Sequence, residues 1–544
     1  MANKKFSQFD LKTNSADVQF VVGYNGTDNV RIAPSNLGGG ATSLNGLSDC
    51  LVDTASLYVG EVPSSLSGNP QNNTSLGIDA SRDLTTATQT TSIGNNAGKQ
   101  ATTGLGNTNL GYQAGSQNQT GIFNTNIGNG SGFWNTASYN VFVGYDSGQI
   151  TGGYNTGVGV SALGKALSSS CIYSVAVGYR AGHQQTAANV VLIGFDAGRA
   201  NTATGNVSIG SQAGYSQTSG TGNTNVGYQA GYSNTTSADR TIIGYEAGEF
   251  NTGAANTFLG LGAGKGASGS STGSYNTSIG KEAGLAITSG GQNVMMGASA
   301  GAAITTGFRN VTLGYEAGLA ITTAYDNILI GSQSGKSLTT SPNSSTNVCI
   351  GTQAGFSANN ANGNVLIGHQ AGYGLTNGET NVIIGQFASA YSGALTTGDN
   401  NTIIGFNSYP SSATVNNEIT LGNSSISTLR CAVTSITSLS DERDKSEIKD
   451  LGYGLAFIDA LQPREFVWDN RPEIDKDGEE IYSANKGKKD FGFIAQEVQE
   501  LDNDTLRLVY DSNPDKLELS YGKLVPILVQ AIKELKAEVE LLKS

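Results

Sequence analysis

A nine-residue motif recurs through most of the chain and constrains its fold more than any other feature. It reads Asn, Thr or Val, a variable residue, an aliphatic residue, Gly, two variable residues, Ala and Gly, as in Asn364-Val-Leu-Ile-Gly-His-Gln-Ala-Gly372. The glycine after the aliphatic residue most often recurs every 17 residues, and at some places after 20. A fixed period of this size indicates a solenoid or another assembly in which each unit packs on its neighbours.

Each unit is too short for a pair of helices, and its Asn and Gly residues favour turns. We expect one short strand, a tight turn and a second, weaker strand. The aliphatic residue and the Thr or Val two positions earlier, such as Ile350 and Val348, share a parity and are predicted to face the buried side. Such a unit cannot bury its apolar face alone, so stacked units and several associated chains are expected to complete the core.

Aromatic residues follow the motif glycine in many units: Tyr112, Tyr145, Tyr179, Phe195, Tyr228, Tyr245 and Tyr315. A column of rings could stack on sugar rings, but the parity shared with the aliphatic residue favours packing in the core or between chains. The acidic residues beside these positions are then predicted to face water: Asp146, Asp196, Glu246, Glu282 and Glu316. No pair of them stands apart from the rest, so the pattern indicates a solvated stripe rather than a catalytic pair.

Composition excludes several other classes of function. Glycine supplies 75 of 544 residues, only 13% of residues are charged, and the net charge is -13. An acidic chain without clustered Lys and Arg is a poor partner for nucleic acid. The four cysteines, Cys50, Cys171, Cys349 and Cys431, lie far apart and the two histidines stand alone, so no disulfide framework, metal site or cofactor is predicted. No window is long and apolar enough to suggest membrane insertion or a signal peptide.

Residues 1–90 fall outside the period and are predicted to form a short β head. Val18–Gly23 and Asn29–Pro34 flank Asn25-Gly26, which indicates a hairpin. From 91 to 422 we expect the shaft of about 17-residue units. Its motif resembles the left-handed β-roll repeats in the heads of trimeric autotransporter adhesins, which carry a similar Asn-x-Val-x-Ile-Gly unit.

A connector at 423–439 leads to a segment of different composition, with eight charged residues between Asp441 and Asp450. Four stretches in order carry a resemblance: Ser440-Asp-Glu-Arg-Asp-Lys445, Leu461-Gln-Pro-Arg-Glu-Phe-Val-Trp468, Phe491-Gly-Phe-Ile-Ala-Gln-Glu-Val498 and Ser520-Tyr-Gly-Lys-Leu-Val-Pro-Ile-Leu-Val-Gln-Ala-Ile-Lys-Glu-Leu535. Residues 440–544 resemble the intramolecular chaperone domain that ends endosialidase-type tailspikes and many phage fibres.

The resemblance implies a trimeric, α+β folding clamp that cleaves its own chain once, between Leu439 and Ser440. Ser440 would be the nucleophile and Lys445 its general base. A hydroxyl needs a nearby base, and a lysine serves only if its pKa is lowered by burial or by neighbouring cations. Asp441, Glu442 and Asp444 would raise that pKa unless they point away or pair with Arg443. No activity on a foreign substrate is predicted.

The chain ends in a predicted helix whose apolar residues step by three and four: Val525, Leu528, Ile532, Leu535, Val539 and Leu542. This spacing is typical of a coiled-coil seam. β-branched residues alternating with Leu favour a parallel dimer, whereas the resemblance implies a trimer. Pro526 is expected in the first turn, where a proline is tolerated.

These features predict a mainly β protein: an adhesive tail-fibre subunit that is trimerised by its C-terminal chaperone. Its expected partners are two further copies of the chain, other tail or baseplate proteins through the N-terminus, and a host surface glycan or receptor. It would be assembled in the host cytoplasm and end up in the virion. A tailspike with glycan-degrading activity on the shaft, and a non-viral trimeric surface adhesin, are the alternatives.

Overall fold

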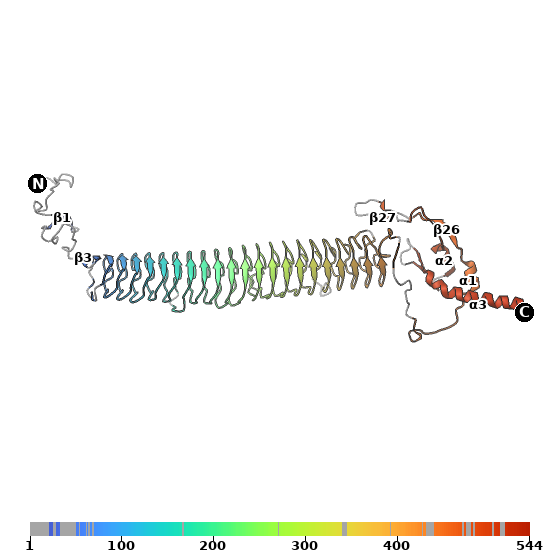
Figure 1. Cartoon of the computed structure of the whole chain (residues 1–544), viewed down its shortest axis with the longest axis horizontal. Coiled ribbons are helices and arrows are strands. Elements are labelled where there is room, and N and C mark those ends of the chain that lie inside the picture. The colour runs from blue at the N-terminus through green and yellow to red at the C-terminus, as the bar shows by residue number, and fades with distance from the viewer. Residues whose placement is uncertain are drawn as a thin grey trace. The chain divides into compact units, whose positions relative to one another are not determined.

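The computed structural model describes residues 21–24, 29–32, 50–53, 55–60, 63, 66–67 and 70–544. Within the last range the gaps are 166–167, 270, 340–344, 392, 427, 431–439, 470–472, 475–479, 482–484, 503–504 and 512–516. The chain forms two compact units, residues 1–292 and 293–544. Both contain a parallel β-solenoid, and the second also contains a small α+β region that ends in a long helix (Figure 1). The predicted fold class is confirmed.

The first unit begins with two antiparallel pairings and continues as a parallel coil. Strands β1 (Val21–Tyr24) and β2 (Asn29–Ile32) form the predicted hairpin, whose turn residues lie outside the described part of the chain. Strand β3 (Cys50–Asp53) pairs antiparallel with β4 (Ser56–Gly60), and β4 pairs in parallel with β5 (Thr74–Gly77). The parallel ladder thus starts before residue 91.

Each following strand of the first unit pairs in parallel with the next one along the chain. These strands are β6 (Thr91–Ile93), β7 (Thr108–Leu110), β8 (Thr125–Ile127), β9 (Val141–Val143), β10 (Thr156–Val158), β11 (Val175–Val177), β12 (Val191–Ile193), β13 (Val207–Ile209), β14 (Thr224–Val226), β15 (Thr241–Ile243), β16 (Thr257–Leu259) and β17 (Thr277–Ile279).

The second unit continues the same pattern. Its parallel strands are β18 (Val294–Met296), β19 (Val311–Leu313), β20 (Ile328–Ile330), β21 (Val348–Ile350), β22 (Val365–Ile367), β23 (Val382–Ile384), β24 (Thr402–Ile404) and β25 (Ile419–Leu421). Its α+β region contains η4 (Glu442–Asp444), α1 (Leu455–Ala460), β26 (Arg464–Val467), β27 (Glu473–Ile474), β28 (Glu480–Ile481), β29 (Lys489–Gly492), α2 (Ala495–Asp502), β30 (Val509–Tyr510), β31 (Glu518–Leu519), η5 (Tyr521–Lys523) and α3 (Leu524–Lys543).

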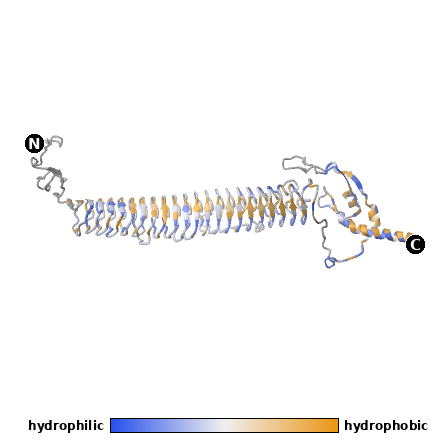
Figure 2. Cartoon of the chain, in the orientation of Figure 1, coloured by the Kyte–Doolittle hydropathy of each residue, from blue (hydrophilic) through white to orange (hydrophobic). Residues whose placement is uncertain are grey.

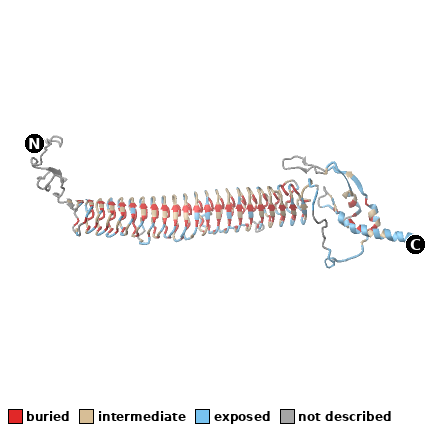
Figure 3. Ribbon diagram, viewed as in Figure 1, coloured by how far each residue is buried: buried red, intermediate tan, exposed pale blue. Residues whose placement is uncertain are grey.

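The middle residue of the three-residue strands β6 to β24 is buried in the core, which reverses the predicted buried face. In β22 Leu366 is fully buried, whereas Val365 and Ile367 remain partly exposed. Buried residues therefore recur from strand to strand along the coil (Figure 3), and hydrophobic residues are frequent on the same strands (Figure 2). Adjacent strand residues must face opposite sides, and a strand of three residues around a narrow core sends only its central side chain inward.

The rest of each turn contains bends and tight turns, so the predicted second strand is wrong for the described units. Between β22 and β23, the chain is joined to the next turn of the coil by single backbone hydrogen bonds. The amide of Gly372 donates to the carbonyl of Ala388 at 2.9 Å, and that of Thr376 to Thr396 at 2.8 Å. Residues with positive φ recur there, such as Gln370 at 57° and Gly372 at 61°, and this backbone is incompatible with an extended strand.

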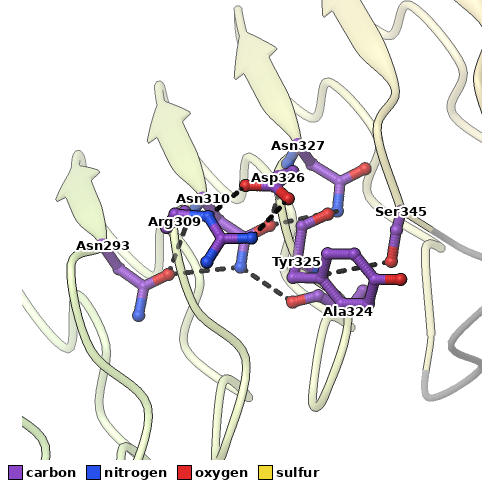
Figure 4. A network of polar contacts seen from close by, with 8 residues as sticks. All are labelled: Asn293, Arg309, Asn310, Ala324, Tyr325, Asp326, Asn327 and Ser345. Carbon is purple, nitrogen blue, oxygen red and sulfur yellow. Dashed lines mark hydrogen bonds and ion pairs between the residues drawn. The ribbon is translucent and has the colours of Figure 1, made fainter.

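The asparagine that precedes most coil strands forms a buried ladder that runs from turn to turn (Figure 4). The amide N–H of Asn310 donates to Oδ1 of Asn293 at 2.9 Å, and that of Asn327 donates to Oδ1 of Asn310 at 3.1 Å. The Asn310 Nδ2 also donates to the carbonyl oxygen of Ala324 at 2.8 Å. One side chain thus satisfies backbone groups of two different segments, which a buried turn requires.

The motif glycine lies where two successive turns approach each other closely. At Gly351 φ is +135°, and a Cβ added there would lie 2.3 Å from the carbonyl oxygen of Gly368. Both the dihedral angle and the contact exclude a side chain. This constraint, rather than turn formation alone, explains the regular recurrence of glycine.

Candidate functional site

The first turn of the α+β region brings the two predicted catalytic side chains together. Residues 442–444 form the 3-10 turn η4, which brings Lys445 back toward Ser440. The Lys445 Nζ lies 2.6 Å from Ser440 Oγ and 3.3 Å from the Ser440 carbonyl oxygen. Leu439, on the other side of the predicted scissile bond, lies outside the described residues.

The acidic residues around this pair are partly neutralised by Arg443. Asp441 caps η4 by accepting the Arg443 N–H at 2.9 Å, and its carboxylate also binds the Arg443 guanidinium at 3.0 and 2.7 Å. This guanidinium and the capping N–H lower the pKa of Asp441. One of the three expected acidic neighbours therefore pairs with Arg443, as the sequence suggested it could.

The Ser440–Lys445 pair has the contact that proton transfer needs but little burial. Both residues are exposed in the single chain. As an ammonium group Lys445 donates to Ser440 Oγ, so it must lose a proton before it can act as a base. The structure thus places Ser440 and Lys445 in direct contact at an exposed position.

The other three resembling stretches are bound to one another. Arg464 on β26 forms a two-point ion pair with Glu497 on α2, at 3.1 and 2.9 Å. The amide of Phe493 donates to the Tyr521 hydroxyl oxygen at 3.1 Å. The strand pair β26–β29 joins the second stretch to the third through four residue pairs. Residues far apart in sequence therefore form one structural region.

Two carboxylates organise this region in a way that the sequence analysis missed. Glu534 on α3 accepts the Leu455 N–H at the start of α1 at 2.6 Å. This bond, with help from Gln530, lowers the pKa of Glu534. Asp502 is buried and accepts the N–H groups of Leu506 and Leu508 at 2.6 and 2.7 Å. The only indication of this role for Asp502 in the sequence is an acidic residue at the end of a helical pattern.

Helix α3 has one buried and one exposed apolar face. Leu524, Ile527 and Ala531 are buried, and the first two belong to a core with Phe457, Val498, Leu508 and other residues. The six residues of the predicted seam are all exposed: Val525, Leu528, Ile532, Leu535, Val539 and Leu542. Pro526 lies in the first turn of α3, as predicted.

The aromatic residues that follow the motif glycine point outward. The prediction that these rings pack in the core of their own chain is therefore wrong. All seven predicted rings are exposed, and pairs such as Tyr228–Tyr245 stack with centroids 5.0 Å apart. The acidic residues beside them are less exposed than expected: Asp196 is buried, and Glu316 binds Lys336 of the next turn at 2.7 Å. This partner, with Gln333 and Tyr315, lowers the pKa of Glu316 to about 2.

Neither a metal site nor a membrane helix is evident in the part of the chain that the structure covers. No group of three or more His, Cys, Asp or Glu side chains gathers there as potential metal ligands. No helix among these residues combines the length and apolar character needed to cross a bilayer. The two cysteines with described side chains, Cys171 and Cys349, are free and buried, and burial raises the pKa of Cys349 to about 12.

Comparison with known proteins finds a family match in the region that contains Ser440 and Lys445. Residues 440–507 match the family model described as chaperone of endosialidase. The match begins at the predicted nucleophile and ends before η5 and α3, so it covers a minor part of the chain. No curated protein and no solved structure matches the chain significantly. A β-solenoid followed by a segment similar to the chaperone of endosialidase fits a tail fibre with a C-terminal chaperone domain.

Proposed function

We propose that the protein is the adhesive subunit of a phage tail fibre, assembled as a homotrimer by its C-terminal chaperone. The observation that carries this proposal is the match to the chaperone of endosialidase at residues 440–507, after a repetitive β-solenoid. Parallel coils of repeated sequence are prone to pairing out of register, and long-range β pairing is slow. A terminal clamp raises the effective concentration of the chains and aligns them.

The exposed face of α3 is the proposed trimerisation surface. Its six apolar residues repeat at coiled-coil spacing and are exposed, while Leu524 and Ile527 of the same helix are already buried in the chaperone core. An apolar stripe of this kind is stabilised when copies of the helix cover it. Residues 1–90 would attach the fibre to other tail or baseplate proteins, and the solenoid would contact the host surface.

The chaperone is proposed to cleave the Leu439–Ser440 bond once assembly is complete. Ser440 Oγ would attack the Leu439 carbonyl carbon while neutral Lys445 takes its proton, and the Lys445–Ser440 contact of 2.6 Å supports these roles. The Leu439–Ser440 C–N bond would then break as Lys445 passes the proton to the freed amino group of Ser440, and water would hydrolyse the resulting Leu439 ester. Burial of the pair in the assembled clamp would supply the environment that the single chain lacks. Loss of the clamp would leave the fibre kinetically trapped.

Intact mass and native mass of freshly expressed protein test both parts. Wild type is expected to give two fragments divided before Ser440, whereas Ser440→Ala stays whole and Ser446→Ala, an exposed serine one residue beyond Lys445, is cleaved normally. The uncleaved Ser440→Ala protein is expected to be trimeric. A monomeric Ser440→Ala chain would contradict the assembly role, and cleavage of that variant would contradict the catalytic role.

No observation favours a glycan-degrading tailspike over this proposal. Glycosidases use two carboxylates that flank the bond to be broken. On the shaft, Glu246 binds Lys265 and Glu316 binds Lys336, so these carboxylates already have cationic partners on neighbouring turns. A non-viral trimeric adhesin stays an alternative with the same chaperone mechanism.

A further inference from the structure

One irregular stretch of the first unit forms a groove across four successive turns. The cavity measures about 560 Å³, and its lining includes Tyr112, Gln113, Asn129, Trp134, Tyr145 and Asp146. All four turns belong to the same compact unit, in the range 107–165. Trp134 is one of only two tryptophans in the protein. The groove is therefore a local departure from the repeat rather than a feature of every turn.

One turn of the groove lacks the aromatic ring and the longer polar side chain that its two neighbours carry. After the motif glycine, neighbouring turns carry Tyr112-Gln113 and Tyr145-Asp146, whereas the turn between them carries Asn129-Gly130. Gly130 has a φ of +67°, and a Cβ there would lie 2.4 Å from Oδ1 of Asp146. The missing aromatic ring and the missing amide side chain together leave a notch.

The notch separates two aromatic rings of the column by two turns of the coil instead of one. Elsewhere in this column rings on adjacent turns stack, with centroids 5.4 Å apart for Tyr179–Phe195 and an angle of 9° between the ring planes. Tyr112 and Tyr145 are two turns apart, or about 9.6 Å at the strand spacing of parallel sheets. A sugar ring between them would lie about 4.8 Å from each, within the range of ring packing.

Three polar side chains of the groove lack hydrogen-bond partners, whereas Gln149 Nε2 donates to the carbonyl oxygen of Gly130 at 2.5 Å. In other turns the residue at the Gln113 position binds its neighbour, as Gln370 binds Gln353 at 2.6 Å and Gln353 binds Gln333 at 2.9 Å. Gly130 interrupts this ladder, and the described residues provide no hydrogen-bond partner for the side chains of Gln113, Asn129 or Asp146. Amide and carboxylate groups beside open aromatic faces are well suited to sugar hydroxyl groups and C–H surfaces.

We propose that this groove binds a linear, uncharged oligosaccharide that lies along the four turns. The proposal rests on the attachment role of the shaft and gives it a site. Trp134 and Tyr145 are 47% and 53% exposed, so ring surface is available to a ligand. Charged groups in the lining are limited to Asp146 and Lys165, which have opposite signs, so a polyanionic glycan is not favoured.

Calorimetric titration of the full-length protein tests the site. The probes are uncharged hexasaccharides of glucose, mannose, galactose and N-acetylglucosamine. At least one is expected to bind wild type, and Trp134→Ala should weaken that binding about tenfold or more. Tyr275→Ala removes another exposed ring outside the groove and should change the affinity less than about twofold. Asn129→Trp fills the exposed notch while keeping Trp134, and should abolish binding.

Failure of the groove and failure of the fibre proposal give different results. The groove is refuted if none of the four probes binds wild type, or if Trp134→Ala and Asn129→Trp bind as wild type does. Native mass is measured for every variant, and each is expected to keep the wild-type assembly state. A wild-type protein that is monomeric would instead contradict the fibre proposal, whatever it binds.

Discussion

Arg240 is expected to destabilise the solenoid, and its replacement by asparagine should strengthen the coil. Arg240 stands in the asparagine ladder, where its N–H donates to Oδ1 of Asn223 at 3.2 Å. Its side chain is 1% exposed, and only Nη2 has a described partner, the carbonyl oxygen of Asn251 at 2.7 Å. Arginine has no acceptor to offer the next ladder residue, Asn256, so the ladder is interrupted here.

The expected change in stability follows from the lowered pKa of Arg240 and from the ladder hydrogen bond that this residue interrupts. Burial lowers the pKa of Arg240 from 12.5 to about 10, which corresponds to roughly 3 kcal/mol against the charged form. Asparagine would remove this cost and restore a hydrogen bond of about 1 kcal/mol. The smaller side chain leaves a void that costs about 1–2 kcal/mol. We therefore expect Arg240→Asn to stabilise the coil by about 2 kcal/mol.

Hydrogen–deuterium exchange measured by mass spectrometry reads this effect locally, because turns of a repeat protein can open without global unfolding. Amides near residues 240–256 should exchange about 30-fold more slowly in Arg240→Asn, the factor that 2 kcal/mol represents. Arg309→Asn, which removes an exposed arginine paired with Asp326, should not slow exchange. Equal or faster exchange around position 240 in Arg240→Asn would refute the reasoning.

Three further predictions concern the coil. Gly227→Ala should destabilise the coil by about 3 kcal/mol or more, because φ is +132° and the new Cβ would lie 2.3 Å from the carbonyl oxygen of Gly244. Gly205→Ala, where the nearest atom to the new Cβ is 3.8 Å away, should cost much less stability. Guanidinium denaturation measures both changes. Asn364→Ala should cost about 2–4 kcal/mol because the buried Asn381 N–H and Gly378 carbonyl lose their partner, whereas Asn377→Ala at an exposed position should be near neutral. The Glu316 carboxylate has a folded pKa of about 2, below its usual 4.5, so its contribution is complete above pH 4.5 and is lost as the pH falls toward 2; melting temperatures of Glu316→Gln should fall less steeply in that window, and identical pH profiles would contradict this.

The period of the sequence located the coil strands, but parity alone could not tell which strand face is inward. In β22 the flanking residues Val365 and Ile367 together are more hydrophobic than the central residue alone. The narrow core nevertheless admits only the central residue, Leu366. Asparagine was interpreted as turn punctuation, whereas Asn310 supplies buried hydrogen bonds between turns. Such roles depend on which residues the next turn brings near, and a single unit of sequence does not contain that information.

The candidate site shows the same division between local and distant information. Ser440 and Lys445 are five positions apart in the sequence, and a short helical turn is enough to bring them together. Their exposure could not be inferred from that spacing. Glu534 binds Leu455 across 79 residues, so no local pattern could have identified it as the cap of α1.

The close approach of successive motif glycines has a consequence for how this protein can change over generations. Each strand pairs with the strand before it and the strand after it in one constant register, as Val348 pairs with Val365 and Val365 with Val382. Duplication or deletion of the DNA that encodes one whole turn leaves these junctions chemically unchanged, whereas a point mutation at a motif glycine damages one of them. We therefore expect natural variants to differ in the number of turns more readily than at the glycines.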